Sequence, residues 1–286
     1  MNIEEAQQDV IKHSTLSNKR VVKGYIKSIV VPRKFHAYCV GTAKSGTHSV
    51  AAIFDKHYRS AHEPDSEQLI YLKDQFDRGE IDIAQLLDFL KKRDTRNYLH
   101  MESSDFGGYF FQEFMKISPK AKFILPIRDC YSFIDSIINH QINNPVTDNS
   151  IWKLGRDINY GNSKNDFSDE EKALTSYQGL YPIEGYINYW VERNKQVLNL
   201  VNGNQLLAFK TSEIKQKTPS ICRFLKVKSE SVNVQSSHSF KAPKKYNLLA
   251  QINSDYIEQL VVASGAKEIM KDFYPEILNI HDSNVL

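Results

Sequence analysis

The feature that most constrains the fold of this 286-residue chain is a glycine-bracketed turn that follows a short apolar run. The run "AYCV" (37–40) is typical of a buried strand, and "GTAKSG" follows it between Gly41 and Gly46. The apolar residues after the turn share one helical face: Val50, Ile53, Phe54 and Tyr58. A strand, a turn and a helix N-terminus form an anion site, because free N–H groups and the helix dipole favour negative charge.

Further apolar runs alternate with helical patterns along the rest of the chain. Three of them indicate buried strands: "YLHM" (98–101), "KFILPI" (122–127) and "LLAFK" (206–210). Asp129 is placed to cap a helix after the second run, apolar spacing predicts a helix over 183–201, and Pro219 is expected to open another. This alternation predicts an α/β fold with a central parallel β-sheet flanked by helices.

The length and the pattern suit a single domain over residues 1–286, with residues 1–30 as an N-terminal extension. Two polar segments interrupt the alternation, 143–181 and 228–247. Because functional loops concentrate at such interruptions, we expect both segments to cover a site.

Charge and cysteine content limit the partners of the chain. The formal net charge of +3 gives no reason to expect nucleic acid or a membrane, so we expect a small-molecule partner. The three cysteines fit neither a disulfide framework nor a zinc site, and we expect no metal. No run approaches the ~20 apolar residues that cross a bilayer. We therefore expect a cytoplasmic protein.

The lysine of the turn is not where a metal-dependent nucleotide hydrolase would have it. A Walker A loop requires Gly-Lys-Ser/Thr, but Gly46 is followed by Thr47 and His48, and Lys44 stands two places before the glycine. The Walker lysine and hydroxyl neutralise a highly charged phosphoryl group together with Mg²⁺. The displaced lysine therefore favours transfer of a less charged group without a metal.

The stretch from Ala43 to Ser49, "AKSGTHS", resembles the 5'-phosphosulfate loop of sulfotransferases that use 3'-phosphoadenosine-5'-phosphosulfate (PAPS), which reads roughly Pro-Lys-Ser-Gly-Thr-Thr-Trp. A second family motif places Arg at a strand end and Ser eight residues later, and "PIRDCYSFIDS" supplies Arg128 and Ser136 at that spacing. A guanidinium and a hydroxyl from the next helix can converge on one phosphate. The resemblance implies a P-loop-like sulfotransferase fold.

Four weaker similarities follow the family order and extend the resemblance over residues 36–247: "INYWVERNKQVL" (187–198), "LLAFKTSEI" (206–214), "TPSICRFLKV" (218–227) and "HSFKAPKKYN" (238–247). The chain departs from the family pattern at Ala43, His48, Ser49 and Thr211, the last of which stands where an adenine-stacking Tyr is common. Contacts to the adenine are therefore less well defined by the resemblance than contacts to the phosphates.

The resemblance implies a role for each matching residue. Lys44 would stabilise the charge that grows on the leaving oxygen, and the turn would hold the 5'-phosphate. The second motif and a basic C-terminal loop would hold the 3'-phosphate. The implied cofactor-binding residues are Lys44, Ser45, Gly46, Thr47, His48, Ser49, Arg128, Ser136, Thr211, Lys241, Lys244 and Lys245.

An acceptor hydroxyl or nitrogen also needs a general base. His100 stands where small-molecule members of the family place a catalytic histidine at a strand end, and Glu63 lies where several bacterial members carry a catalytic glutamate. Both remain candidates, and so do the outside choices His48, His62, Glu102 and Asp105. The carboxylates could instead recognise a cationic acceptor.

The resemblance thus predicts sulfuryl transfer from PAPS to a hydroxyl or an amine or carbamoyl nitrogen of a small polar acceptor. A natural-product tailoring enzyme similar to the sulfotransferases of saxitoxin-type toxins fits this prediction, with residues 143–181 covering the acceptor. A carbohydrate sulfotransferase remains an alternative. Two alternatives belong to other classes: a P-loop nucleotide kinase and a non-catalytic nucleotide-binding module.

Overall fold

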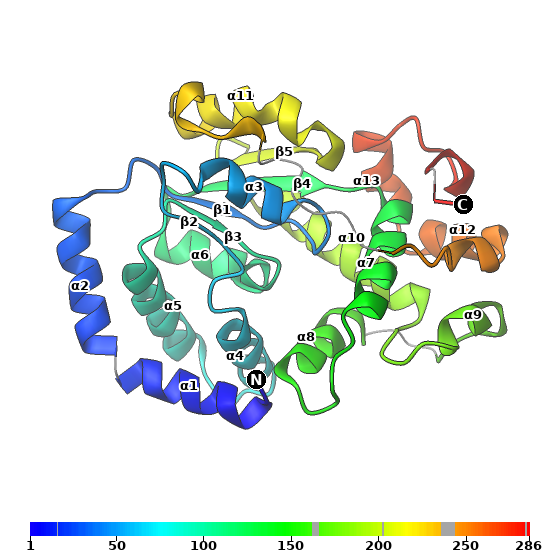
Figure 1. The fold of residues 1–286 in the computed structure, drawn as a ribbon, viewed down its shortest axis with the longest axis horizontal. Helices are drawn as coiled ribbons and strands as arrows, with labels where there is room; N and C mark the ends of the chain where they lie inside the picture. Colours follow the sequence, from blue (N-terminus) through cyan, green and yellow to red (C-terminus); the bar gives the residue numbers. More distant parts are fainter. Residues whose placement is uncertain (16, 162–165, 202, 236–243, 284) are drawn as a thin grey trace.

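The computed structural model describes residues 1–286 except 16, 162–165, 202, 236–243 and 284. Its centre is a five-stranded parallel sheet in the order β2-β3-β1-β4-β5 (Figure 1). The strands are β1 (Ala37–Cys39), β2 (Ser60–His62), β3 (Met101–Ser103), β4 (Lys122–Ile127) and β5 (Leu206–Lys210). The predicted α/β class with a central parallel sheet is confirmed.

Helices surround this sheet. The α-helices of the described residues are α1 (Ile3–Thr15), α2 (Ser17–Val30), α3 (Thr47–Phe54), α4 (Ser66–Asp77), α5 (Ile83–Asn97), α6 (Phe111–Ile117), α7 (Cys130–Asn143), α8 (Ile151–Tyr160), α9 (Lys172–Thr175), α10 (Ile183–Leu200), α11 (Ile214–Leu225), α12 (Ser254–Ala263) and α13 (Ala266–Phe273). Short 3₁₀ helices include η1 (Phe106–Phe110), η2 (Asp169–Glu171), η3 (Thr211–Glu213), η4 (Ser229–Ser231), η6 (Leu249–Gln251) and η7 (Ile280–Ser283). Among the described residues, no helix combines the length and the hydropathy needed to cross a membrane.

Successive residues of β1 point to opposite faces of the sheet, and each face has its own hydrophobic core. Ala37 and Cys39 pack with residues of α3 and α11 on one face. Tyr38 packs on the other face, where its ring stacks 4.3 Å from the ring of Phe114 in α6. Burial on both faces explains why the strands are continuous apolar runs.

The strand predicted at 98–101 is wrong in its position. Tyr98 has a left-handed backbone (φ 45) and caps the C-terminus of α5, so the strand begins only at Met101. His100 therefore precedes β3 instead of ending it. The edge strand β2 was not predicted, because its three half-exposed residues, "SAH", carry no periodic apolar signal.

The predicted cap of α7 is confirmed, because the Asp129 side chain accepts a hydrogen bond from the backbone N–H of Ser132.

Two further expectations need correction. Pro219 does not open α11, because the helix begins at Ile214 and the proline lies inside it. The segment 143–181 is not one loop, since it contains α8, η2 and α9.

The N-terminal helices pack against the rest of the protein, α1 on α4 and α2 on α5 (Figure 1). Gly24 makes the close approach of α2 to α5 possible, because a Cβ at this position would lie 2.0 Å from the carbonyl oxygen of Thr95. The two helices within the predicted N-terminal extension are thus packed onto the rest of the protein.

Candidate active site

The glycine turn between β1 and α3 has a strained backbone that presents the N-terminus of α3. Lys44 and Gly46 both have positive φ, 63° and 98°. A Cβ at Gly46 would lie 2.5 Å from Cδ1 of Ile214, so this position requires glycine. Ser45 closes the turn, because its N–H and its hydroxyl both donate to the carbonyl oxygen of Thr42, at 3.1 and 2.7 Å.

Two neighbouring elements hold the turn in place. The hydroxyl of Thr211, directly after β5, donates to the carbonyl oxygen of Ser45 at 2.6 Å. The N–H of Ala43 donates to the hydroxyl of Tyr189 in α10 at 3.3 Å. The turn is therefore preorganised by contacts from residues that lie far away in the sequence.

Arg128, the first residue after β4, connects the second sequence motif to the turn. Its Nη1 donates to the carbonyl oxygen of Lys44 at 3.2 Å, and its Nε donates to the hydroxyl of Ser132 at 3.0 Å. Burial lowers the pKa of Arg128, and it also lowers the pKa of Lys44, which the charge of Arg128 lowers further. Two cations thus lie together in a partly desolvated site that attracts an anion.

A cavity of about 1220 Å³ lies beside these residues. It is lined by most of the predicted cofactor-binding residues: Lys44, Gly46, Thr47, His48, Ser49, Arg128, Ser136, Thr211 and Lys245. The structure therefore brings both sequence motifs to one cavity, although the motifs are separated by about eighty residues of chain.

Of the other three predicted cofactor-binding residues, Ser45 and Lys244 do not line this cavity. Ser45 is fully buried within the turn. Lys244 extends over the ring of Tyr246, with Nζ 4.7 Å from the ring centroid. Lys241 lies outside the described residues. Lys245, which does line the cavity, has its Nζ 3.8 Å from Oδ2 of Asp135.

Glu63 reaches the same cavity from the end of β2, again with a positive φ of 50°. Its Oε1 accepts a hydrogen bond from the N–H of Asp105 at 2.6 Å, and its Oε2 accepts from the hydroxyls of Ser66 and Ser104. Burial, with a contribution from the charge of Asp105, raises the pKa of Glu63 to about 7. A carboxyl group that titrates near neutral pH suits a general base.

Asp105, which follows β3, lines the cavity next to Glu63. Its carboxylate accepts hydrogen bonds from the hydroxyl of Tyr189 and, at 3.3 Å, from Nδ2 of Asn159. Burial raises its pKa, while the charge of Arg193 lowers it. The sequence did not identify Tyr189 and Asn159 as partners of Asp105. A tyrosine within a helix and an asparagine within a polar segment carry no local signal that they bind a carboxylate.

The histidines His48 and His62, the less favoured candidates for the base, lie close together. His48 is in the first turn of α3, and His62 ends β2. Nε2 of His62 is 3.2 Å from the hydroxyl of Thr47, and the rings of His48 and His62 are 5.0 Å apart. Burial, and then the charge of His48, lowers the pKa of His62 to about 4, so this imidazole is neutral at pH 7. His62 can therefore orient the Thr47 hydroxyl without adding charge to the cavity.

His100 does not lie in this cavity. It precedes β3, at the opposite end of the sheet from the glycine turn, and its Nδ1 accepts a hydrogen bond from the N–H of Arg59 at 3.2 Å. Its ring packs 5.4 Å from Phe35 and 5.5 Å from Tyr58. The position expected for a catalytic histidine at a strand end is thus wrong, and His100 makes packing contacts instead. Glu102 does not line the cavity either, and its carboxylate pairs with Arg93 at 2.9 Å.

Helix α8 forms one wall of the cavity. From the sequence, this helix was expected to be part of the covering loop over residues 143–181. Trp152, Arg156 and Asn159 line the cavity from this helix. Gly155 allows α8 to approach α4, because a Cβ there would lie 2.9 Å from Cδ1 of Ile70. Helical spacing of the apolar residues in "IWKLGRDINY" is the signal that could have identified this helix.

Comparisons with known proteins agree with this architecture. No protein-family model and no characterised sequence matches the chain. Its structure is similar to that of a sulfotransferase from Mycobacterium avium, with a TM-score of 0.51, 11% identity, and coverage of 94% of this chain and 86% of that chain. The chain has the sulfotransferase fold.

Two other sulfotransferases have similar structures at lower scores. The enzyme from Alicyclobacillus acidocaldarius has a TM-score of 0.47 and 16% identity, covering 82% of this chain and 95% of that one. The sulfotransferase domain from the curacin biosynthetic pathway has a TM-score of 0.41 and 10% identity, covering 88% of this chain and 96% of that one.

Within this sulfotransferase fold, all five strands deliver a cavity residue from their carboxyl ends. These residues are Lys44 after β1, Glu63 after β2, Asp105 after β3, Arg128 after β4 and Thr211 after β5. This edge is where ligands bind in open α/β sheets. The sulfotransferase fold therefore accounts for the convergence of residues that are scattered along the chain.

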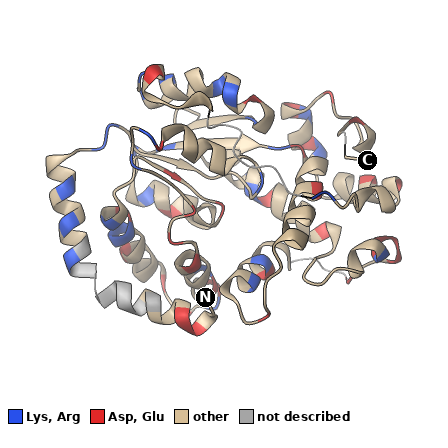
Figure 2. Ribbon diagram, in the orientation of Figure 1, with Lys and Arg blue, Asp and Glu red and all other residues tan. Residues whose placement is uncertain are grey.

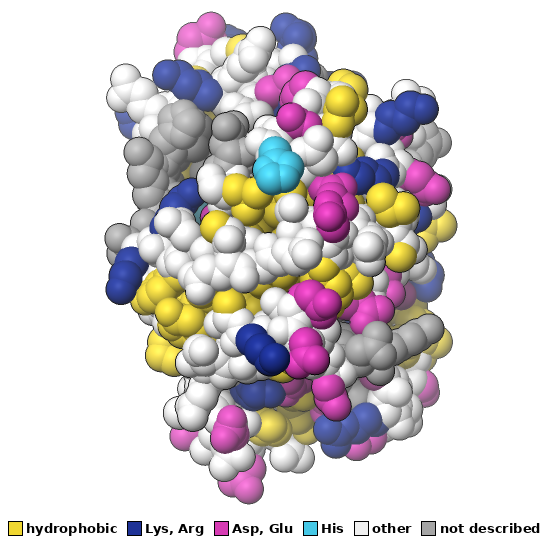
Figure 3. Space-filling model, turned by 90° about the vertical axis from the view of Figure 1, so that its right-hand side faces the viewer, with side chains coloured by type: hydrophobic (Ala, Val, Ile, Leu, Met, Phe, Trp, Pro, Cys, Tyr) yellow, Lys and Arg dark blue, Asp and Glu magenta, His cyan; other side chains and the backbone are white. Residues whose placement is uncertain are grey.

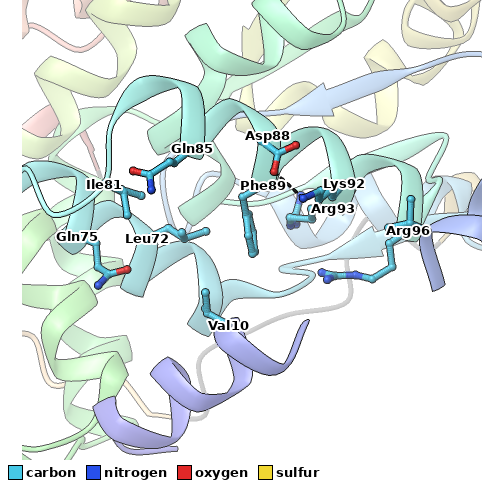
Figure 4. A pocket seen from close by; sticks show the side chains of 11 residues that line it. Val10, Leu72, Gln75, Ile81, Gln85, Asp88, Phe89, Lys92, Arg93 and Arg96 are labelled. Carbon is cyan, nitrogen blue, oxygen red and sulfur yellow. Dashed lines mark ion pairs between the residues drawn. The ribbon is translucent and has the colours of Figure 1, made fainter. Parts of the chain in front are cut away.

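A second, smaller pocket of about 250 Å³ lies between the N-terminal helices and α4 and α5 (Figure 4). Leu72 and Phe89 form part of its apolar wall, and Lys92 and Arg96 lie along α5. Lys92 is already paired with Asp88 at 2.6 Å, and Arg96 with Asp65 at 2.9 Å. This pocket contains none of the predicted site residues.

Proposed function

We propose that this protein transfers a sulfuryl group from PAPS to a small polar acceptor. The observation that carries the proposal is the hydrogen bond from Arg128 to the carbonyl oxygen of Lys44, at the wall of one large cavity. It joins an anion site at the N-terminus of α3 to a second cationic site at the end of β4. A ligand with two separated phosphate groups fits such a pair of sites.

The residues present fit the two ends of this nucleotide. Backbone N–H groups of Thr47, His48 and Ser49 at the N-terminus of α3 would hold the 5'-phosphosulfate. Arg128 and Ser136 would hold the 3'-phosphate, with Lys245 beside them. Pockets for drug-sized ligands measure roughly 300–1,000 Å³. The cavity of about 1220 Å³ therefore has room for a nucleotide and an acceptor together.

Bound PAPS would supply the sulfuryl group and a phosphate leaving group. The part of this chain would be to stabilise the charge that grows on the leaving oxygen, and we assign this role to the ammonium group of Lys44, a residue that lines the cavity. Because the transferred group carries little net charge, no step requires the Gly-Lys-Ser/Thr metal site that the sequence lacks.

Glu63 is our proposed general base. As a carboxylate it would take the proton from the acceptor hydroxyl or nitrogen while the acceptor attacks sulfur. Three hydrogen-bond donors, from Ser66, Ser104 and Asp105, fix its orientation. The acidic pair of Glu63 and Asp105 also favours an acceptor with a hydroxyl or amino group over an anionic one. Natural products and carbohydrates both meet that description.

Thermal-shift measurements with 3'-phosphoadenosine-5'-phosphate, AMP and ATP test the cofactor. We expect clear stabilisation by the 3'-phosphorylated nucleotide, about 2.7 kcal/mol at a concentration one hundred times its Kd, and much less by AMP. Equal or greater stabilisation by ATP with Mg²⁺ would favour a nucleotide kinase and overturn the proposal.

Transfer itself is tested with PAPS labelled with ³⁵S and a panel of hydroxyl and amine acceptors, including aminoglycosides, phenols and simple sugars. Label appearing in an acceptor, and absent with Lys44→Ala, supports the proposed activity. Tight nucleotide binding with no transfer across the panel would leave a binding module as the better description.

A further inference from the structure

The outer face of α2 is an exposed apolar strip on the surface of the protein. Five large apolar residues of this helix are between 54% and 71% exposed: Val22, Tyr25, Ile26, Ile29 and Val30. At 100° per residue they fall within an arc of roughly 140°. Contiguous exposed apolar residues of this kind mark an interaction surface, whereas scattered ones do not.

This strip faces outward because the opposite side of α2 is already packed. Gly24 lies on the side of the helix opposite the strip and touches α5, where a Cβ would lie 2.0 Å from the carbonyl oxygen of Thr95. Ser28, on the same side as Gly24, is partly buried. Turning the apolar residues inward would break this close contact, so α2 cannot bury them within its own chain.

Every charged residue of α2 itself is basic. Residues 17–34 contain six Lys and Arg residues and no Asp or Glu, and Figure 2 shows Lys and Arg but no acidic residue along α2. Lys23 and Lys27 are exposed along one flank of the apolar arc, and Lys19 is exposed within the arc near the same edge. By contrast, the face shown in Figure 3 has side chains of both signs interspersed. The overall charge of +3 therefore conceals a local concentration of positive charge on α2.

An anionic bilayer surface matches both properties of α2. A helix with an apolar face and a basic flank lies in the interface plane of a membrane, where its apolar residues enter the acyl boundary and its lysines reach the lipid phosphates. A second copy of the chain matches less well. A two-fold interface through α2 would place the same basic helix on both sides and bring like charges together.

We propose that α2 docks this protein onto the surface of a bilayer that contains anionic phospholipids. The inference is independent of the sulfuryl transfer proposed above, because α2 contributes no residue to the large cavity. It differs from the sequence-based expectation of no membrane partner, which rested on net charge and on the absence of a spanning segment.

Co-sedimentation with vesicles tests this proposal, using phosphatidylcholine alone and phosphatidylcholine mixed with phosphatidylserine. We expect the protein to bind the mixed vesicles, and to bind them less as ionic strength rises. The combined variant Ile26→Ser, Ile29→Ser, Val30→Ser and the combined variant Lys19→Gln, Lys23→Gln, Lys27→Gln should each lower the partition coefficient by about tenfold or more.

The matched control is Val262→Ser with Leu278→Ser, which removes apolar residues that are 61% and 73% exposed on another part of the surface. This control should bind vesicles as the unchanged protein does, and all variants should keep the same unfolding temperature because the substituted side chains are exposed. Two results would overturn the proposal. One is failure to bind the mixed vesicles, and the other is a dimer in solution that the Ile26, Ile29 and Val30 substitutions convert to a monomer without vesicle binding.

Discussion

The residues that follow the strands give the large cavity a basic half, with Lys44 and Arg128, and an acidic half, with Glu63 and Asp105. Asp129 and Asp135 also line the cavity, and their charges act on Arg128. The central strands β1 and β4 deliver Lys44 and Arg128, whereas β3 and the edge strand β2 deliver Asp105 and Glu63. The cavity therefore has a site suited to an anion near β4. Near β2 it has a site suited to a group that donates a proton. This polarity suits the proposed reaction between an anionic donor and a neutral or cationic acceptor.

The two halves also differ in how they are held. The basic half depends on backbone geometry, with the positive φ of Lys44 and Gly46 and the bond from Arg128 to the turn. In the acidic half Glu63 also has a positive φ, but its carboxylate and that of Asp105 are held mainly by the hydrogen bonds that they accept. Substitutions in the basic half should thus affect nucleotide binding and turnover, whereas substitutions in the acidic half should mainly change the pH dependence and the acceptor.

The largest effect is expected for Lys44→Ala. Loss of the ammonium that stabilises the leaving oxygen should lower kcat by about 10³-fold, at the upper end of what one electrostatic group contributes. The unfolding temperature should change little. The matched control is Lys120→Ala, which removes an exposed lysine away from the cavity. Turnover of Lys44→Ala within threefold of the unchanged protein would remove its proposed role.

The next largest effect is expected for Glu63→Gln, which keeps the shape of the side chain and removes the base. Turnover should fall by about 10²-fold or more. Because burial raises the pKa of Glu63 to about 7, activity of the unchanged protein should increase as pH rises through 7 and the carboxylate forms.

The residual activity of Glu63→Gln should no longer increase as pH rises through 7. The control variant Glu230→Gln, at an exposed position, should keep this increase. If Glu63→Gln raises KM for a cationic acceptor but leaves kcat and the pH profile unchanged, Glu63 recognises the acceptor and is not the base.

Arg128→Ala should weaken binding of 3'-phosphoadenosine-5'-phosphate by about ten- to a hundredfold, because a charge-assisted hydrogen bond contributes roughly 1.5–3 kcal/mol. Binding of AMP, which has no 3'-phosphate, should change much less. Isothermal titration calorimetry of both nucleotides measures this difference, with Arg78→Ala as the exposed control. An equal loss for both nucleotides would place Arg128 at the 5' end instead.

His100→Ala should lower the stability of the protein but not its activity. Loss of the acceptor for the Arg59 N–H, together with ring contacts, should lower the free energy of unfolding by about 1–3 kcal/mol, with kcat nearly unchanged. Burial lowers the pKa of His100 to about 4, so the unfolded chain binds a proton that the folded chain does not between pH 6.5 and 4. Stability of the unchanged protein should therefore fall as pH is lowered through this range, and less so in the variant. A large loss of kcat would restore a catalytic role for His100.

The smallest effect is expected for Lys245→Ala. The side chain is 63% exposed and its Nζ is 3.8 Å from the Asp135 carboxylate, so its attraction for a phosphate is screened by solvent. Nucleotide affinity should fall less than about fivefold, and the difference should vanish at high ionic strength. A larger loss that persists in salt would show that Lys245 belongs to the core of the basic half.

The basic half was largely predictable from the sequence, and the acidic half was not. A turn and a strand end are local features, and two short motifs that resemble those of the sulfotransferase family implied that Lys44 and Arg128 bind one ligand. Glu63 was one of two open candidates for the base, because nothing local separates it from His100. The three-residue strand β2 has no apolar period, and the network of Asp105, Tyr189 and Asn159 joins three distant segments.

The sequence by itself determined the α/β alternation, the strands β1, β4 and β5, and the glycine turn, because these depend on interactions between residues close along the chain. Only the tertiary structure decided which candidate base shares the cavity with the turn. Strand order and the exact start of β3 fix whether a side chain lies at the carboxyl or the amino end of the sheet. These two properties come from packing between elements, and they place Glu63 beside the turn and His100 at the far end.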